Sequence, residues 1–225
     1  MGKPNPLLSF GIKLLLNALE QKDQQAKGGV PELGEVGAVK GLKQKEGSVV
    51  LLLGKRESGK TICAQRLAQV LARPTYAISP EQKPPDWIEE IKLEQIAELP
   101  PPYSTLICDD LPAYMGSRDY TDSWVQMIER IIPTVRHRRK LHLIFVSQTS
   151  GQADKWALNA DLVIMKPMGW LYAETERSAV KRLADKVMPI FRQMTDSQQK
   201  KQAYLFSDSW QGLVRINLPG QEPII

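Results

Sequence analysis

The sequence Gly54-Lys55-Arg56-Glu57-Ser58-Gly59-Lys60-Thr61 sets the architecture expected for this chain of 225 residues. It matches the pattern G-x-x-x-x-G-K-[ST] of a phosphate-binding loop. The apolar run from Val49 to Leu53 precedes it directly, and a helical pattern begins at Lys60. Both the letters and their strand-loop-helix setting therefore predict a P-loop that joins a buried strand to a helix.

Each residue type in this loop has a physical role in binding a nucleoside triphosphate. Glycines let backbone N–H groups curl around an anion, and the helix N-terminus adds a positive dipole end. Lys60 is expected to reach the terminal phosphates, and Thr61 is expected to ligate magnesium. The predicted cofactors are therefore ATP and Mg²⁺. The expected nucleotide contacts are Gly54, Glu57, Ser58, Gly59, Lys60, Thr61 and Ile62.

A second acidic motif ends a later apolar run, in which Leu106-Ile107-Cys108 is followed by Asp109 and Asp110. This is the position of a Walker B motif, 49 residues beyond Lys60. We expect Asp109 to hold the metal together with Thr61, usually through water, and Asp110 to orient or deprotonate the attacking water. The pair is informative only together with the upstream P-loop, since Asp pairs are common in turns.

Short runs that are apolar on consecutive residues alternate with helical stretches. Such runs indicate strands covered on both faces, so we predict an α/β domain with a central, mostly parallel sheet flanked by helices. The expected strands are Val49 to Leu53, Tyr76 to Ser79, Thr105 to Cys108, Leu141 to Ser147 and Asp161 to Met165. The expected helices run from Lys60 to about Ala72, from Asp86 to Glu98, from Thr121 to about Arg139, and around Val180, Leu183 and Val187. A C-terminal β-hairpin is expected from Ala203 to Phe206 and from Leu213 to Leu218.

The N-terminal part carries Leu8, Ile12, Leu15, Leu16 and Leu19 on one helical stripe. This N-terminal helix could pack on the core, on a neighbouring subunit, or on a membrane surface. Residues 27–47 look like a linker or loose hairpin. We therefore expect residues 1–47 to form a helix and linker, and residues 48–225 to form the ATPase domain.

Composition limits the function classes. Two cysteines, each inside an apolar run, give no disulfide framework and no metal-ligand spacing, so both are expected to be buried. No signal peptide or membrane-spanning segment is recognisable, which predicts a soluble, intracellular protein. The net charge of +5 fits a polyanionic partner without proving one.

Two further features surround the strand from His142 to Ser147. Gln148 follows it, where the side chain could sense the γ-phosphate. The basic run Arg136-His137-Arg138-Arg139-Lys140 precedes it. That run could be a solvated helix end, a DNA-backbone contact, or an arginine finger inserted into a neighbouring subunit's site. For the finger, Arg138 and Arg139 are favoured over Arg118.

Together, GKRESGKT, LICDD and HLIFVSQTSG resemble the FtsK/HerA superfamily of RecA-like ATPases, which includes genome-packaging ATPases of tailless, membrane-containing viruses. The resemblance covers about residues 48–166. It implies a RecA-like (ASCE) sheet with the Walker B strand between the P-loop strand and another strand. It also implies a hexameric ring (a homo-oligomer), an arginine supplied in trans, and translocation of double-stranded DNA. A capsid or viral membrane protein would be the docking partner, in the host cytoplasm or the virion.

The sequence departs from this family at Asp110, where many relatives have Glu, and at Glu57, where they often have Gly. Two other function classes share the P-loop. An AAA+-like helicase loader or transposition helper would carry a small helical lid after the fifth strand, and a small-molecule kinase would carry an Arg-rich lid. A partitioning-type ATPase would have glycines after Lys55 instead of Arg56 and Glu57.

Overall fold

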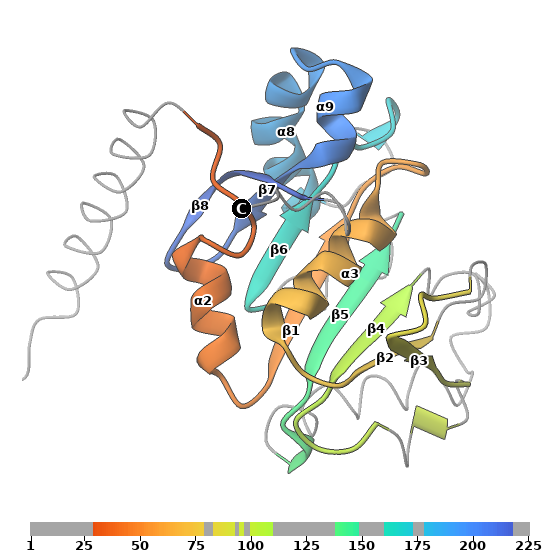
Figure 1. Cartoon of the computed structure of the whole chain (residues 1–225). Coiled ribbons are helices and arrows are strands. Elements are labelled where there is room, and N and C mark those ends of the chain that lie inside the picture. Colours follow the sequence, from red (N-terminus) through yellow and green to blue (C-terminus); the bar gives the residue numbers. More distant parts are fainter. Residues whose placement is uncertain are drawn as a thin grey trace, which may run out of the picture.

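The computed structural model describes residues 29–78, 83–92, 95–96, 100–109, 138–148, 160–172 and 178–217. A single eight-stranded sheet runs through these residues. Its strands are β1 (Ser48–Leu53), β2 (Thr75–Ile78), β3 (Ile88–Glu90), β4 (Thr105–Asp109), β5 (His142–Ser147), β6 (Leu162–Met165), β7 (Gln202–Phe206) and β8 (Gln211–Arg215). Their order across the sheet is β3-β2-β4-β5-β1-β6-β7-β8 (Figure 1).

The first six strands are parallel, and β7 and β8 add to the β6 edge as an antiparallel hairpin. This confirms the predicted α/β class, the mostly parallel sheet and the C-terminal hairpin. All five strands expected from apolar runs are present, with ends that differ by one residue. The carboxyl ends of the parallel strands share one edge of the sheet, which is where a ligand site is expected.

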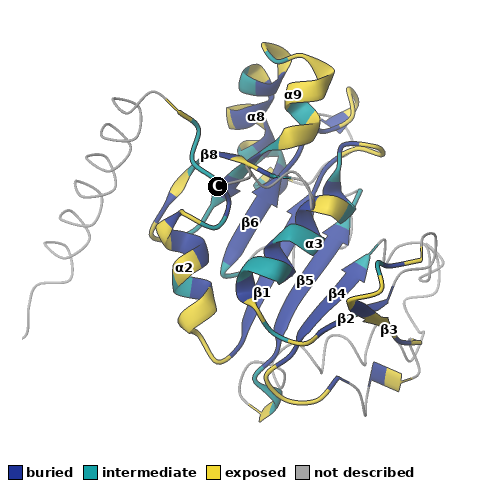
Figure 2. Ribbon diagram, viewed as in Figure 1, coloured by how far each residue is buried: buried dark blue, intermediate teal, exposed yellow. Residues whose placement is uncertain are grey.

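The helices lie on both faces of the sheet. Helices α2 (Gly37–Gln44) and α3 (Lys60–Leu71) pack on one face, and α8 (Ser178–Arg192) packs on the other. The short α9 (Asp196–Lys201) then leads into β7. Side chains of β1 alternate between the two cores, so the strand is buried throughout (Figure 2). This explains why β1 reads as an unbroken apolar run and not as an alternating one.

Two expectations about secondary structure are wrong. Residues 37–44 form helix α2 inside the stretch expected to be a linker, and Val36, Val39 and Leu42 belong to the core beside α3. The core therefore begins before β1. The helix expected from Asp86 to Glu98 is also wrong at its start, since Ile88–Glu90 is the edge strand β3, paired with β2. Pairing with a neighbouring strand overrides a weak helical pattern here.

The strand order corrects the arrangement that the family resemblance implied. The Walker B strand β4 does not adjoin the P-loop strand, because β5 lies between β4 and β1. The three strands are nevertheless contiguous, which is the condition for Gln148 at the end of β5 to face the phosphate site.

Two predicted helices lie outside the described residues: the N-terminal helix, and the helix from Thr121 except for its last residues, Arg138 and Arg139. Within the described ranges, no helix combines the length and hydrophobicity needed to cross a bilayer.

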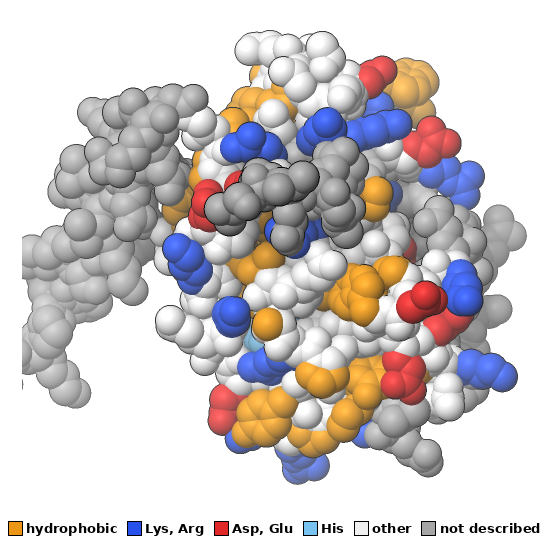
Figure 3. Space-filling model, viewed as in Figure 1, with side chains coloured by type: hydrophobic (Ala, Val, Ile, Leu, Met, Phe, Trp, Pro, Cys, Tyr) orange, Lys and Arg blue, Asp and Glu red, His pale blue; other side chains and the backbone are white. Residues whose placement is uncertain are grey.

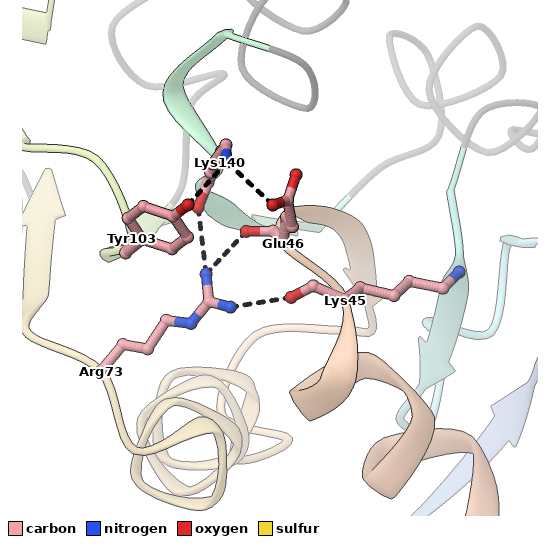
Figure 4. A network of polar contacts seen from close by, with 5 residues as sticks. All are labelled: Lys45, Glu46, Arg73, Tyr103 and Lys140. Atoms are coloured by element: carbon pink, nitrogen blue, oxygen red, sulfur yellow. Dashed lines mark hydrogen bonds and ion pairs between the residues drawn. The ribbon is translucent and has the colours of Figure 1, made fainter.

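A polar network closes the sheet at the edge opposite the P-loop (Figure 4). The Arg73 guanidinium donates hydrogen bonds to the carbonyl oxygens of Lys45, Glu46 and Lys140. The Lys140 ammonium contacts the Glu46 carboxylate at 2.8 Å and the Tyr103 hydroxyl at 2.6 Å. Arg73, which follows α3, thus bonds to both the segment that leads into β1 and the segment that leads into β5. These bonds hold the amino ends of the two central strands in place.

His142 lies one step inside this network and is completely buried. Its Nδ1 is 2.7 Å from the Ser48 hydroxyl on the neighbouring strand. Burial, assisted by the positive charge of Arg73, lowers the pKa of His142 to about 4, and Asp161 opposes the shift. The imidazole is therefore neutral near pH 7.

Candidate nucleotide-binding site

The P-loop backbone requires glycine at both ends. A Cβ on Gly54 would lie 2.6 Å from the Cβ of Lys166 and 2.9 Å from the Ser58 hydroxyl oxygen, closer than atoms can approach. Gly59 is the N-cap of α3 and has φ 86°, a left-handed conformation that other residues rarely adopt. Between them, Glu57 has φ 59° although it carries a side chain. A non-glycine residue in the left-handed backbone conformation costs about 1–3 kcal/mol of folding free energy. It keeps this conformation only where the surrounding structure holds it.

Lys60 begins α3 and is mostly buried at the centre of the loop. Its ammonium donates a hydrogen bond of 2.8 Å to the backbone carbonyl of Lys55, on the other side of the loop. The positive charge is thus already inside the curve of the P-loop. Backbone N–H groups, the α3 N-terminus and this ammonium together favour a polyphosphate anion there.

The side chains of the two motifs meet at the carboxyl edge of the sheet. The Thr61 hydroxyl donates a 2.7 Å hydrogen bond to Oδ2 of Asp109, although the residues are 48 positions apart. A hydroxyl and a carboxylate are both hard oxygen ligands of the kind that Mg²⁺ prefers. The donor set therefore fits the magnesium ion that a nucleoside triphosphate would bring. Asp110 lies outside the described residues.

Gln148 and Ile62 flank this centre. Gln148 follows Ser147, which pairs with Leu53, so the glutamine stands next to Gly54 at the end of β1. Because β5 separates β1 from β4, Gln148 lies between the P-loop and the strand that carries Asp109. Ile62 is partly exposed on the first turn of α3, directly after Thr61.

The two candidate finger arginines lie at the other edge of the sheet. Arg138 and Arg139 precede β5, whose six residues span about 20 Å before Gln148. Arg138 is exposed, whereas Arg139 donates from Nη1 to the Ile96 carbonyl at 2.8 Å. Neither arginine can reach the P-loop of its own chain, so a finger role would have to be played in a neighbouring subunit's site, and the exposed Arg138 is the better placed for that role.

A residue that sequence reasoning missed supports the P-loop from behind. Lys166 follows β6, is completely buried, and donates from Nζ to the carbonyl oxygens of Gln199, Lys200 and Gln202 at 2.6–2.8 Å. Burial lowers the pKa of Lys166 to about 8, with Cys63 opposing the shift and the Lys60 charge assisting it. The signal available in the sequence was a lysine directly after the buried strand Leu162–Met165, where a charge needs buried partners.

Lys166 and its neighbour also hold the P-loop backbone. The Lys166 amide donates to the Leu53 carbonyl, and the Lys55 amide donates to the Pro167 carbonyl, both at 2.8 Å. The segment after β6 therefore continues the pairing of β6 with β1 into the start of the loop. These hydrogen bonds fix the backbone at the start of the loop, and such support from surrounding structure is what a strained conformation like that of Glu57 requires.

The two cysteines are buried, as the sequence predicted. Burial raises the pKa of both Cys63 and Cys108 to about 12. The thiols are therefore protonated and do not act as nucleophiles near neutral pH. Within the described ranges, no cluster of three or more His, Cys, Asp or Glu side chains forms a metal site of its own.

No protein-family model and no curated protein matches the sequence. Among solved structures, the genome-packaging NTPase B204 of Sulfolobus turreted icosahedral virus 2, solved with ATP-gammaS, matches 77% of this chain and 98% of its own, at 12% identity and TM-score 0.52. The Type VII secretion ATPase EccC of Thermomonospora curvata matches 77% of this chain with 25% of its own, at 14% identity and TM-score 0.48. The flagellar accessory protein FlaH of Methanocaldococcus jannaschii matches 64% of this chain and 76% of its own, at 15% identity and TM-score 0.38.

The match to B204 shows a shared fold. That shared fold and the meeting of Thr61 with Asp109 agree with the α/β P-loop architecture that the motifs predicted. The chain has the RecA-type fold of a P-loop NTPase.

Proposed function

We propose that the protein hydrolyses ATP with the help of Mg²⁺. The observation that carries this proposal is the 2.7 Å contact between Thr61 of the P-loop and Asp109 at the end of β4. These are the two oxygen groups that a P-loop ATPase uses to hold magnesium against the β- and γ-phosphates. Lys60 would neutralise the phosphates, Asp110 would act on the attacking water, and Gln148 would sense the γ-phosphate.

The finer proposal is a motor that moves double-stranded DNA, with packaging of viral DNA as its task. The net charge of +5 supports a polyanionic partner. On the face drawn in Figure 3, Lys and Arg side chains lie along the top, near α9, and are also spread over the rest of this face. The basic residues of α8 and α9 are Lys181, Arg182, Lys186, Arg192, Lys200 and Lys201.

A translocating motor of this kind would work as a hexameric ring. The exposed position of Arg138, at the edge opposite the P-loop, suits a group that acts on a neighbouring subunit's nucleotide. A capsid or viral membrane protein would anchor the ring, which would be found in the host cytoplasm and in the virion.

The alternative is an AAA+-like nucleotide switch that acts through protein partners. That class would place a small helical lid after the fifth strand of the core. Here α8 packs on the sheet, and the chain then returns as β7 and β8, which extend the same sheet. The hairpin therefore favours the motor over the switch.

The test is the steady-state ATPase rate of the full chain with and without long double-stranded DNA, across a salt titration. A motor predicts stimulation that falls as salt rises, because DNA binding releases counterions. Mass determination with bound nucleotide should show a ring. Lys60→Ala is the inactive control, and turnover in that variant would refute the site. A slow, DNA-indifferent rate from a monomer would favour the switch.

A further inference from the structure

The segment after β6 carries an exposed tryptophan next to the P-loop. Two hydrogen bonds of 2.8 Å, from the Lys166 amide to the Leu53 carbonyl and from the Lys55 amide to the Pro167 carbonyl, join this segment to the loop. Trp170 follows Pro167 by three residues, so its backbone lies within about 10 Å of that junction. It has 84% of its surface exposed, more than any other large hydrophobic residue in the described ranges.

The turn that presents Trp170 is anchored at both ends. Met168 is buried, and its backbone amide lies 3.3 Å from the Met188 sulfur of α8. The Tyr172 amide donates to the Gly169 carbonyl, and the Tyr172 hydroxyl donates to the Asp185 carboxylate at 2.9 Å. A fixed turn thus holds an indole ring in water, although burying such a ring is strongly favourable. The ring is therefore held in a fixed place with its surface open to a ligand.

The position of the strands shows which part of a nucleotide would lie there. The magnesium end is set by Asp109 on β4, on the β5 side of β1. Strand β6 flanks β1 on the other side, so a nucleotide that lies along this edge of the sheet, with its phosphates at the magnesium end, would have its nucleoside end toward β6.

We propose that Trp170 is the platform on which the nucleotide base stacks. The proposal rests on the proposed function, since it adds a base subsite to the same ATP site. An aromatic ring stacked on a base contributes about 1–3 kcal/mol, which corresponds to an affinity change of about 5- to 150-fold. Because every base has a π-face, the platform selects for a nucleoside over a bare polyphosphate and only weakly among bases.

The experiment compares ATP with inorganic tripolyphosphate, both with magnesium, by calorimetric titration of the full chain. Trp170→Ala should weaken ATP binding by about 5- to 150-fold and leave tripolyphosphate binding unchanged. Trp170→Phe should restore most of the ATP affinity, because it keeps an aromatic face. Trp87→Ala is the matched control: Trp87 is also exposed but precedes β3, at the amino edge of the sheet, and should change neither affinity.

Two results would overturn the base platform while the ATP site stands. In one, Trp170→Ala binds ATP as the wild type does. In the other, ATP and tripolyphosphate weaken equally, which would give Trp170 a structural role in shaping the P-loop. Wild-type protein that binds neither ligand would instead refute the ATP site itself, so the two failures are distinguishable.

Discussion

Acid should destabilise this fold through one buried histidine. His142 has its pKa lowered to about 4 by burial and by Arg73. An unfolded chain would carry the same group at about 6.5. Between these values the unfolded chain binds a proton that the folded chain does not, so the stability gained by neutral His142 is present above pH 6.5 and is lost as pH falls toward 4.

The size of the effect follows from the separation of the two pKa values. The difference is worth about 3.4 kcal/mol in full, and about 2 kcal/mol of it should be lost between pH 7 and pH 5. Carboxylates also titrate on the way to pH 5, so the wild-type loss alone does not identify its source. A comparison with a variant that lacks the imidazole isolates the contribution of His142.

Urea unfolding at the two pH values measures this difference. His142→Asn retains a polar group that can bond to the Ser48 hydroxyl, and it should lose about 2 kcal/mol less than the wild type on acidification. The other histidine of the chain is His137, and His137→Asn is the control that should keep the wild-type loss. If His142→Asn and the wild type lose equal stability, the imidazole is not held neutral and the reasoning is refuted.

Three further outcomes concern the nucleotide site. Asp110→Asn should retain ATP binding and lose turnover, as measured by titration and phosphate release; loss of binding would instead assign Asp110 to the metal. Gly54→Ala should abolish nucleotide binding, because its Cβ would lie 2.6 Å from the Lys166 Cβ, whereas Gly41→Ala, which faces open space, should bind normally. Lys166→Met should cost about 3 kcal/mol in urea unfolding, because three partly buried carbonyl oxygens lose their hydrogen-bond donor; an unchanged midpoint would contradict that role.

The parts of the fold that sequence predicted are those with strong local signals. Strand β1 and the loop from Gly54 to Thr61 are recognisable because a fully apolar run and a fixed spacing of Gly, Lys and Thr are set by local chemistry. The C-terminal hairpin was likewise marked by two short apolar runs around a turn. The contact between Thr61 and Asp109 followed from the rule that parallel strands end at one edge.

The missed parts depend on contacts between distant segments. Helix α2 begins at Gly37 and includes Gly41, which argue against a helix, and it is held by packing of Val36, Val39 and Leu42 beside α3. Strand β3 has three residues and exists through pairing with β2. The position of β5 between β1 and β4 is likewise a property of the assembled sheet.

Glu57 is a further case in which contacts between distant segments matter, because it stands where a glycine would be expected from the local backbone conformation. Many P-loops place glycine where the backbone turns left-handed, and this chain has a glutamate there with φ 59°. The start of the loop before Glu57 is held by distant residues: the Lys55 amide bonds to the Pro167 carbonyl, and Gly54 packs against Lys166, whose ammonium bonds to the Lys200 carbonyl of α9. The segment after β6 thus shapes the phosphate loop and also carries Trp170. A change in this segment should therefore alter phosphate binding through Lys166 and base binding through Trp170, which makes the two effects separable by the choice of ligand.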